Sequence, residues 1–284
     1  MTVNVVVALS AESRPLVDHF RLSEDRAAVG FRVFRGEEMR LIVTGPGRVA
    51  CAAGVATLAT LATLGEQGRD RGIPAWLNLG IAGHGNHAVG EGVHALSILE
   101  GATGRRWYPP QILQMPGRGE RVCTVDVPET GYPESCVYDM EASAFYATAL
   151  RYATGELIQV YKIISDNRDS GVENVDRYGV RDSIVRHLPA VEAIVTGLAG
   201  LAGAADASRP RLPELDHITT RWHFTVSQQR QLRELLRRWE TLGGGEPVLD
   251  ADLNRCPSAK SVLGELSARL NRVYEGTGRG SIVD

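Results

Sequence analysis

The stretch VNVVVALSAE, residues 3–12, decides the fold class of this 284-residue chain. Its first seven residues form an apolar run rich in β-branched side chains, which is typical of a strand buried on both faces of a parallel sheet. The residues that follow predict a helix over 11–20. A buried strand that leads into a helix is the opening of an α/β unit, so we expect an α/β domain.

The same alternation continues to residue 203. Further strands are predicted at 31–34, 39–44, 76–79, 93–99 and 157–164, and further helices at 49–64, 139–152 and 183–201. The stretch GIAGHG, residues 80–85, contains too many glycines for a regular element, so we predict that the preceding strand ends there in a turn. Residues 1–203 are therefore predicted to form one α/β domain with a central, mixed or largely parallel sheet.

The pattern changes after residue 203. Residues 204–216 are polar and contain two prolines, which is typical of a linker. Residues 217–284 show no strand alternation and are predicted to be a helical appendage of unknown role. Its two expected helices, each behind an N-cap candidate, are 228–242 behind Ser227, ended by the glycines 243–245, and 258–274 behind Ser258.

The charge balance argues against nucleic acid and membrane surfaces as partners. The 31 Lys and Arg residues against 34 Asp and Glu residues give a net charge of −3, which provides no general attraction for phosphate backbones or anionic lipid. One local basic run stands out, and we interpret it as a solvated helix face rather than a nucleic-acid site: Arg230, Arg233, Arg237 and Arg238.

The compartment is expected to be the cytoplasm. No stretch reaches the roughly 18 to 20 apolar residues of a membrane span, and the amino terminus lacks the basic region that begins a signal peptide. The four cysteines show no CxxC pairing and are too few for a disulfide scaffold, so we expect buried free thiols.

Acidic residues stand near the carboxyl ends of several predicted strands, where open α/β sheets bind ligands. Glu12 follows the first strand, Asp166 follows the last one, and Glu141 stands where a helix is predicted to begin. We expect these three side chains to converge on one edge of the sheet. His84 and His87 could lie nearby, but the pair lacks a third ligand, so no metal site is predicted.

Five motifs stand in the order found in the purine nucleoside phosphorylase and nucleosidase superfamily: ALSAE, TGPGRVACAAGVAT, LNLGIAGHG, YDMEASAFYA and KIISDNRD. The sequence most resembles the methylthioadenosine/S-adenosylhomocysteine nucleosidases. The resemblance covers residues 3–203 and implies a nucleoside phosphorylase-like three-layer fold with a central mixed sheet. Residues 204–284 have no counterpart in that family core.

The resemblance implies a role for each acid. Asp166 would share a proton with the purine N7, with Ser165 as its orienting partner, although a turn aspartate would look the same in sequence. Glu141 would accept hydrogen bonds from the ribose hydroxyls while Met140 packs on the sugar, unless Glu141 is only a first-turn helix acid. Glu12 would activate the attacking water, the alternative being a solvated acid at a helix start.

The sequence also departs from the family pattern. The glycine-rich stretch, which is expected to line the pocket, carries Ile81 where the family has a hydroxyl residue: Gly80, Ile81, Ala82 and Gly83. The arginine with which the phosphorylases grip phosphate is missing, so water is the better nucleophile. The stretch before YDMEA is short, and its candidates for base binding are Tyr132 and the backbone around Val125.

These observations predict a cytoplasmic, homodimeric nucleosidase that needs no metal or organic cofactor, with dimerisation implied by the resemblance alone. Its substrate would be a purine nucleoside with a modified 5′ group and most suitably an adenine base, such as methylthioadenosine, S-adenosylhomocysteine or 5′-deoxyadenosine. Two alternatives remain open: a phosphorolytic purine nucleoside phosphorylase, and a catalytically inactive nucleoside-binding regulatory protein.

Overall fold

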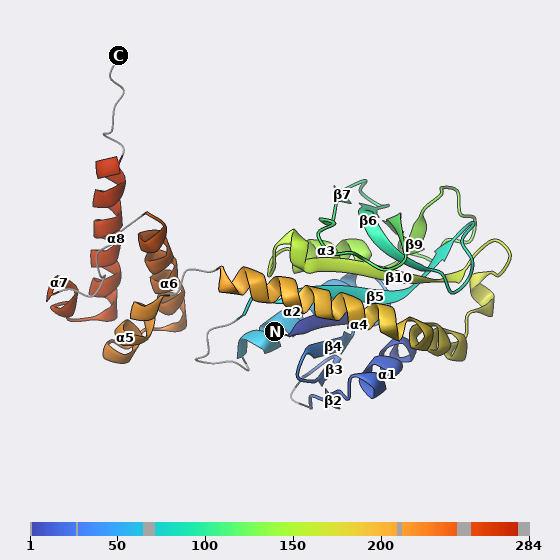
Figure 1. Cartoon of the computed structure of the whole chain (residues 1–284), viewed down its shortest axis with the longest axis horizontal. Coiled ribbons are helices and arrows are strands. Elements are labelled where there is room, and N and C mark those ends of the chain that lie inside the picture. The colour runs from blue at the N-terminus through green and yellow to red at the C-terminus, as the bar shows by residue number, and fades with distance from the viewer. Residues whose placement is uncertain (1, 27, 65–71, 209–211, 243–250, 278–284) are drawn as a thin grey trace, which may run out of the picture. The chain divides into compact units, whose positions relative to one another are not determined.

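The computed structural model of the chain describes residues 2–26, 28–64, 72–208, 212–242 and 251–277. Its residue contacts divide the chain into two compact units, Met1–Ala207 and Ser208–Asp284 (Figure 1).

The first unit is built around one mixed β-sheet (Figure 1). Parallel pairs join β1 to β4 and β5, and β5 to β10, while β10 and β6 run antiparallel. The strand order is β10 (Ile158–Asp166), β6 (Gly92–Glu100), β8 (Arg118–Thr124), β9 (Val137–Asp139), β5 (Ala75–His84), β1 (Val3–Val7), β4 (Met39–Val43), β3 (Arg32–Arg35) and β2 (Ser23–Glu24), with β7 (Arg106–Trp107) paired to β6.

Helices cover both faces of this sheet and make the fold three-layered. Helices α1 (Ser10–His19) and α4 (Arg177–Ala207) pack on one face, and their apolar residues share a core with the side chains of β1. Helices α2 (Arg48–Leu64) and α3 (Ala142–Ala149) pack in the core of the other face. The predicted α/β architecture with a central mixed sheet is therefore confirmed.

The glycine-rich stretch is not the turn that we predicted. Strand β5 continues through it to His84, because Gly80 and Ile81 pair with Lys162 and Ile163 of β10. The glycines serve side-chain packing instead: a Cβ at Gly80 would lie 2.9 Å from Oε1 of Glu12. Strand β5 thus passes directly beneath two of the predicted acids, Glu12 at Gly80 and Asp166 at Gly83.

The helix predicted at 139–152 begins later and ends earlier. Asp139 is the last residue of β9, and α3 spans only Ala142–Ala149. Asp139 Oδ2 accepts hydrogen bonds from the backbone N–H groups of Glu141 and Ala142, at 3.2 and 2.7 Å. Since this carboxylate satisfies N–H groups that open the helix, the chain turns from strand to helix there.

Helix α4 is longer than the predicted 183–201 and is the one helix among the described residues that is long and apolar enough to cross a membrane. Its buried apolar side chains contribute to the core on one face of the sheet, among them Ile184, Val191 and Leu198. The short 3₁₀ helices Gly155–Leu157 and Val172–Asn174 flank β10 in sequence.

The second unit contains more helices than the predicted pair: α5 (Pro213–Arg221), α6 (Val226–Thr241), α7 (Ala251–Asn254) and α8 (Ala259–Thr277). They enclose a core of their own, to which Trp222, Leu236 and Leu266 contribute. The predicted linker 204–216 is helical at both ends, because residues 204–207 belong to α4 and 213–216 to α5.

The two predicted caps differ in outcome. Helix α6 begins one residue before Ser227, and Thr225 caps it by accepting a hydrogen bond from the N–H of Gln228. Ser258 does cap α8, since its hydroxyl accepts from the N–H of Ser261. Residues 243–245 lie outside the described residues.

All four cysteines are free, and three are buried, whereas Cys256 is only half-buried.

Candidate active site

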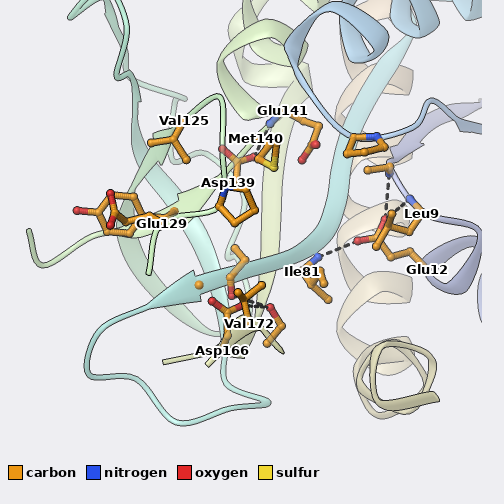
Figure 2. Close-up of a pocket in the computed structure, with 17 residues that line it drawn as sticks. Leu9, Glu12, Ile81, Val125, Glu129, Asp139, Met140, Glu141, Asp166 and Val172 are labelled. Carbon is orange, nitrogen blue, oxygen red and sulfur yellow. Dashed lines mark hydrogen bonds between the residues drawn. The ribbon is translucent and has the colours of Figure 1, made fainter. Parts of the chain in front are cut away.

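A pocket opens where β1, β5, β9 and β10 end and where α1 and α3 begin (Figure 2). Every predicted site residue except Gly80 and Tyr132 lines it, and Gly80 lies directly beneath Glu12. The lining residues are Ala8, Leu9, Glu12, Pro46, Ile81, Ala82, Gly83, Val125, Pro128, Glu129, Tyr138, Asp139, Met140, Glu141, Ser165, Asp166 and Val172.

Glu12 reaches the pocket from the first turn of α1 and is only 1% exposed. Its Oε2 accepts hydrogen bonds from the backbone N–H groups of Ala8 and Leu9, and its Oε1 accepts one from Ile81 at 2.9 Å. The side chain is therefore fixed by both β5 and the end of β1, and it is not a solvated acid. Burial raises the pKa of Glu12 above its usual value, against the opposing effect of the hydrogen bonds from Leu9 and Ile81.

Asp166 ends β10 after a break in the strand register and is 6% exposed. Its Oδ1 accepts a hydrogen bond from the Ser165 hydroxyl, and its Oδ2 accepts one of 2.6 Å from the Tyr132 hydroxyl. A Cβ at Gly83, the register partner of Asp166 on β5, would overlap Oδ2. The glycine therefore makes room for this carboxylate.

Glu141 stands at the N-cap of α3 and is also buried. Its Oε1 accepts a hydrogen bond of 2.8 Å from the N–H of Gly47, in the TGPGRVACAAGVAT motif, and its Oε2 lies 3.8 Å from Nζ of Lys162. Burial raises the pKa of Glu141, the positive charge of Lys162 opposes this, and the nearby Asp139 adds to it. The carboxylate is held in place from two sides.

Lys162 supplies the buried positive charge beneath the pocket. Its Nζ lies 2.9 Å from Oδ2 of Asp139, whose Oδ1 accepts a hydrogen bond of 2.7 Å from Thr124. Burial alone would lower the pKa of Lys162, but the carboxylates of Asp139 and Glu141 outweigh it and raise the pKa above its usual value. Lys162 therefore remains a cation that compensates two buried acids.

Met140 and Val125 line the pocket as predicted, but the proposed base-binding roles change. The backbone N–H of Val125 already donates to the carbonyl of Asp139, so this N–H is not available to a base. Tyr132 does not line the pocket; its buried ring lies behind Asp166. Figure 2 shows Val125 and Glu129 on the side of the pocket opposite Glu12.

His84 and His87 do not line the pocket. Their rings stack with centroids 3.8 Å apart, and Nε2 of His87 lies 3.1 Å from Oε1 of Glu120. Burial lowers the pKa of His84. No cluster of three or more His, Cys, Asp or Glu side chains in the described part of the chain has the arrangement of a metal site.

Acids supply all the charge in the pocket lining. Among the described lining residues every charged side chain is a carboxylate: Glu12, Glu129, Asp139, Glu141 and Asp166. Lys162 lies behind this surface, paired to Asp139. The pocket is therefore suited to a neutral or cationic ligand, and it offers no cationic side chain to an anion.

Reasoning from the sequence gave no role to Lys162 or Asp139, and it predicted base binding for Tyr132 rather than a contact with Asp166. Lys162 is one of only two lysines in the chain and stands at the centre of a strand with otherwise apolar neighbours, which is a usable signal of a paired buried charge. Asp139 stands in the DMEA motif without an assigned role. Tyr132 carried no signal of its contact with Asp166, because a loop brings the two together.

No family model and no curated protein matches the sequence. Solved structures do match the fold. A 5′-methylthioadenosine/S-adenosylhomocysteine nucleosidase from S. pneumoniae aligns with a TM-score of 0.54 at 20% identity, covering 70% of this chain and 100% of that one. An S-adenosylhomocysteine nucleosidase from Streptococcus pyogenes gives 0.53 at 19%, covering 71% and 97%.

A futalosine hydrolase mutant from Helicobacter pylori gives a TM-score of 0.54 at 11% identity, covering 69% of this chain and 99% of that one. At such identities the likeness concerns the fold. The chain has the fold of the nucleoside phosphorylase and nucleosidase superfamily, to which these neighbours belong.

Proposed function

We propose that this protein is a nucleosidase that hydrolyses the N-glycosidic bond of a purine nucleoside. The observation that carries the proposal is that three buried carboxylates from distant parts of the chain, Glu12, Glu141 and Asp166, line one pocket. Glycosidic cleavage develops positive charge on the sugar and negative charge on the departing base. Acids placed on both sides of the bond suit this reaction, and the fold of the solved nucleosidases supports it.

Asp166 is the proposed acid. As the bond between the anomeric carbon and the base breaks, its electron pair moves to the base, and the proton of the Asp166 carboxyl passes to the purine N7. Loss of such an acid costs about a hundredfold to ten-thousandfold in rate. Ser165 orients the carboxyl through its hydrogen bond to Oδ1.

Glu12 is the proposed base. The oxygen of a water molecule bonds to the anomeric carbon, and the water gives one proton to Glu12. The second product is therefore a free pentose. Burial raises the pKa of Glu12, which makes its carboxylate a stronger base than an exposed glutamate. The hydrogen bond from the N–H of Ile81 fixes Oε1, which leaves the missing hydroxyl at this position without consequence for placing Glu12.

Glu141 and Met140 are proposed to hold the sugar. The carboxylate of Glu141 can accept hydrogen bonds from ribose hydroxyls, and the thioether of Met140 can pack on the ring. Val125 lines the side opposite Glu12 (Figure 2), where the planar base would lie. The preferred substrates are adenine nucleosides with a modified 5′ group, such as methylthioadenosine, S-adenosylhomocysteine or 5′-deoxyadenosine.

Water is favoured over phosphate as the nucleophile because the described lining residues include no Lys or Arg. Phosphate is an anion near neutral pH, and the carboxylates in the lining would repel it. We further propose that the enzyme acts in the cytoplasm. We also propose that it is a homodimer, and light scattering on the purified protein would test this oligomeric state.

A substrate panel tests the proposal. The protein is incubated with methylthioadenosine, S-adenosylhomocysteine, 5′-deoxyadenosine, adenosine and inosine, and free base is measured by chromatography. Release of base from one or more of them is expected. Tight binding without any free base would instead support the inactive regulatory protein.

A further inference from the structure

Tyr132 makes a direct contact with the proposed acid that the proposed mechanism does not use. Its hydroxyl donates a hydrogen bond of 2.6 Å to Oδ2 of Asp166, and the residue is only 1% exposed. Tyr132 belongs to the loop between β8 and β9, 34 residues before Asp166, and stands outside the pocket lining. Its hydroxyl can therefore act on a ligand through Asp166, while its ring lies against Tyr138 of the pocket lining, with ring centroids 6.1 Å apart.

The surroundings of Tyr132 fix this contact. Tyr132 has a φ of 46°, an uncommon left-handed conformation for a residue with a bulky side chain. Arg168 holds that backbone by donating a hydrogen bond of 2.7 Å to the Tyr132 carbonyl. A Cβ at Gly83 would lie 3.1 Å from Cε1 of the Tyr132 ring, and a Cβ at Gly85 would lie 2.9 Å from Cβ of Tyr132. Both glycines therefore make room for the tyrosine side chain.

The tyrosine is held as a neutral donor. Burial, followed by its hydrogen bond to Asp166, raises the pKa of Tyr132 well above its usual value. The hydroxyl therefore keeps its proton throughout the neutral pH range. A protonated carboxyl group keeps acceptor positions beside its O–H, so Asp166 can accept from Tyr132 and Ser165 and still present its proton to the pocket.

We propose that Tyr132 is a positioning residue that aims the Asp166 carboxyl at the base and stabilises the carboxylate formed when Asp166 gives up its proton. The inference rests on the proposed nucleosidase function. As the proton moves from Asp166 to the base, negative charge appears on Asp166, and the hydrogen bond from Tyr132 becomes charge-assisted and stronger. A contact that strengthens in this way lowers the barrier of the chemical step.

Two substrates with different leaving groups test the proposal. A purine nucleoside needs a proton on its base, whereas 4-nitrophenyl β-D-ribofuranoside releases a resonance-stabilised phenolate that needs none. Tyr132→Phe keeps the ring and removes only the hydroxyl. It is expected to lower kcat for the purine nucleoside by about ten- to a hundredfold and to leave KM and the nitrophenyl substrate unchanged.

A double-mutant cycle gives a second readout. Because Tyr132 acts through Asp166, Tyr132→Phe in an Asp166→Asn background is expected to cause no further loss with the purine nucleoside. Tyr161→Phe is the matched control: this tyrosine is also 1% exposed and donates or accepts one hydrogen bond, of 2.9 Å to His187, outside the pocket lining. It is expected to keep wild-type kcat.

The outcomes separate this inference from the function on which it rests. Three results would each overturn the role of Tyr132 and leave the proposed function standing. They are wild-type activity in Tyr132→Phe, equal losses with both substrates, and a further loss in the Asp166→Asn background. A wild-type protein that releases no base from any nucleoside would overturn the proposed function and this inference with it. Thermal unfolding of each variant, compared with Tyr161→Phe, shows whether the fold is kept.

Discussion

Nζ of Lys162 lies 2.9 Å from Oδ2 of Asp139, and both side chains are almost completely excluded from solvent. The pair joins β10 to β9 directly beneath the pocket, with Glu141 3.8 Å from the same nitrogen. One buried cation thus compensates two carboxylates, and through them it holds the start of α3 in place.

Lys162→Met should therefore destabilise the protein strongly. Removing one partner of a buried pair leaves an uncompensated charge, which costs about 3 to 5 kcal/mol in the free energy of unfolding. Denaturant unfolding monitored by circular dichroism measures this. Arg238→Met, which breaks an exposed pair with Glu234, is the control and should change stability by less than about 1 kcal/mol. A loss in Lys162→Met as small as in the control would contradict the role of the pair.

Gly83→Ala should abolish most of the activity while the protein stays folded. The new Cβ would overlap Oδ2 of Asp166 and would approach the ring of Tyr132 to 3.1 Å, so the acid must move. The control is Gly200→Ala in α4, where a Cβ meets no atom within 4 Å, and it should stabilise the helix by up to about 1 kcal/mol. Steady-state kinetics of a Gly83→Ala enzyme indistinguishable from wild type would show that Asp166 tolerates displacement.

The pH profile should show the raised pKa of Glu12. Glu12 must be ionised to take a proton from water, so kcat/KM should fall as the pH drops through its pKa, and this limb should lie above the ordinary glutamate range. Glu12→Gln should remove the limb together with most of the activity. A profile that stays flat down to the usual glutamate pKa would mean that another group accepts the proton.

The sequence was sufficient for the elements whose structure follows from local pattern. The apolar run in β1 and the alternation of strands and helices predicted the layers, and the acids near strand ends predicted the pocket. Glycine misled the prediction at 80–85, because a missing side chain favours a turn in isolation but permits a close-packed strand beside Glu12 and Asp166. That distinction depends on residues 68 or more positions away.

The contacts of Tyr132 and Lys162 could not be read locally either. Tyr132 is a loop residue in a left-handed conformation, and it reaches Asp166 only because the fold brings its loop to the end of β10. Whether the buried Lys162 is a stable cation depends on which carboxylates lie next to it, and Asp139 comes from another strand. The helical unit shows the same limit. The N-cap of α6 is Thr225 and not the predicted Ser227, because Thr225 and Gln228 form a capping box in which each side chain bonds the backbone of the other.

The products formed in the absence of phosphate test the proposed reaction most directly. Wild-type protein and Asp166→Asn are incubated with the best nucleoside of the panel in phosphate-free buffer, and the base and the sugar are identified by mass spectrometry. We predict that the wild type releases the free purine and an unphosphorylated pentose at a rate that added phosphate does not change. Asp166→Asn should be slower by about a hundredfold or more. A strict requirement for phosphate with formation of a sugar phosphate, or full activity of Asp166→Asn, would contradict the proposal.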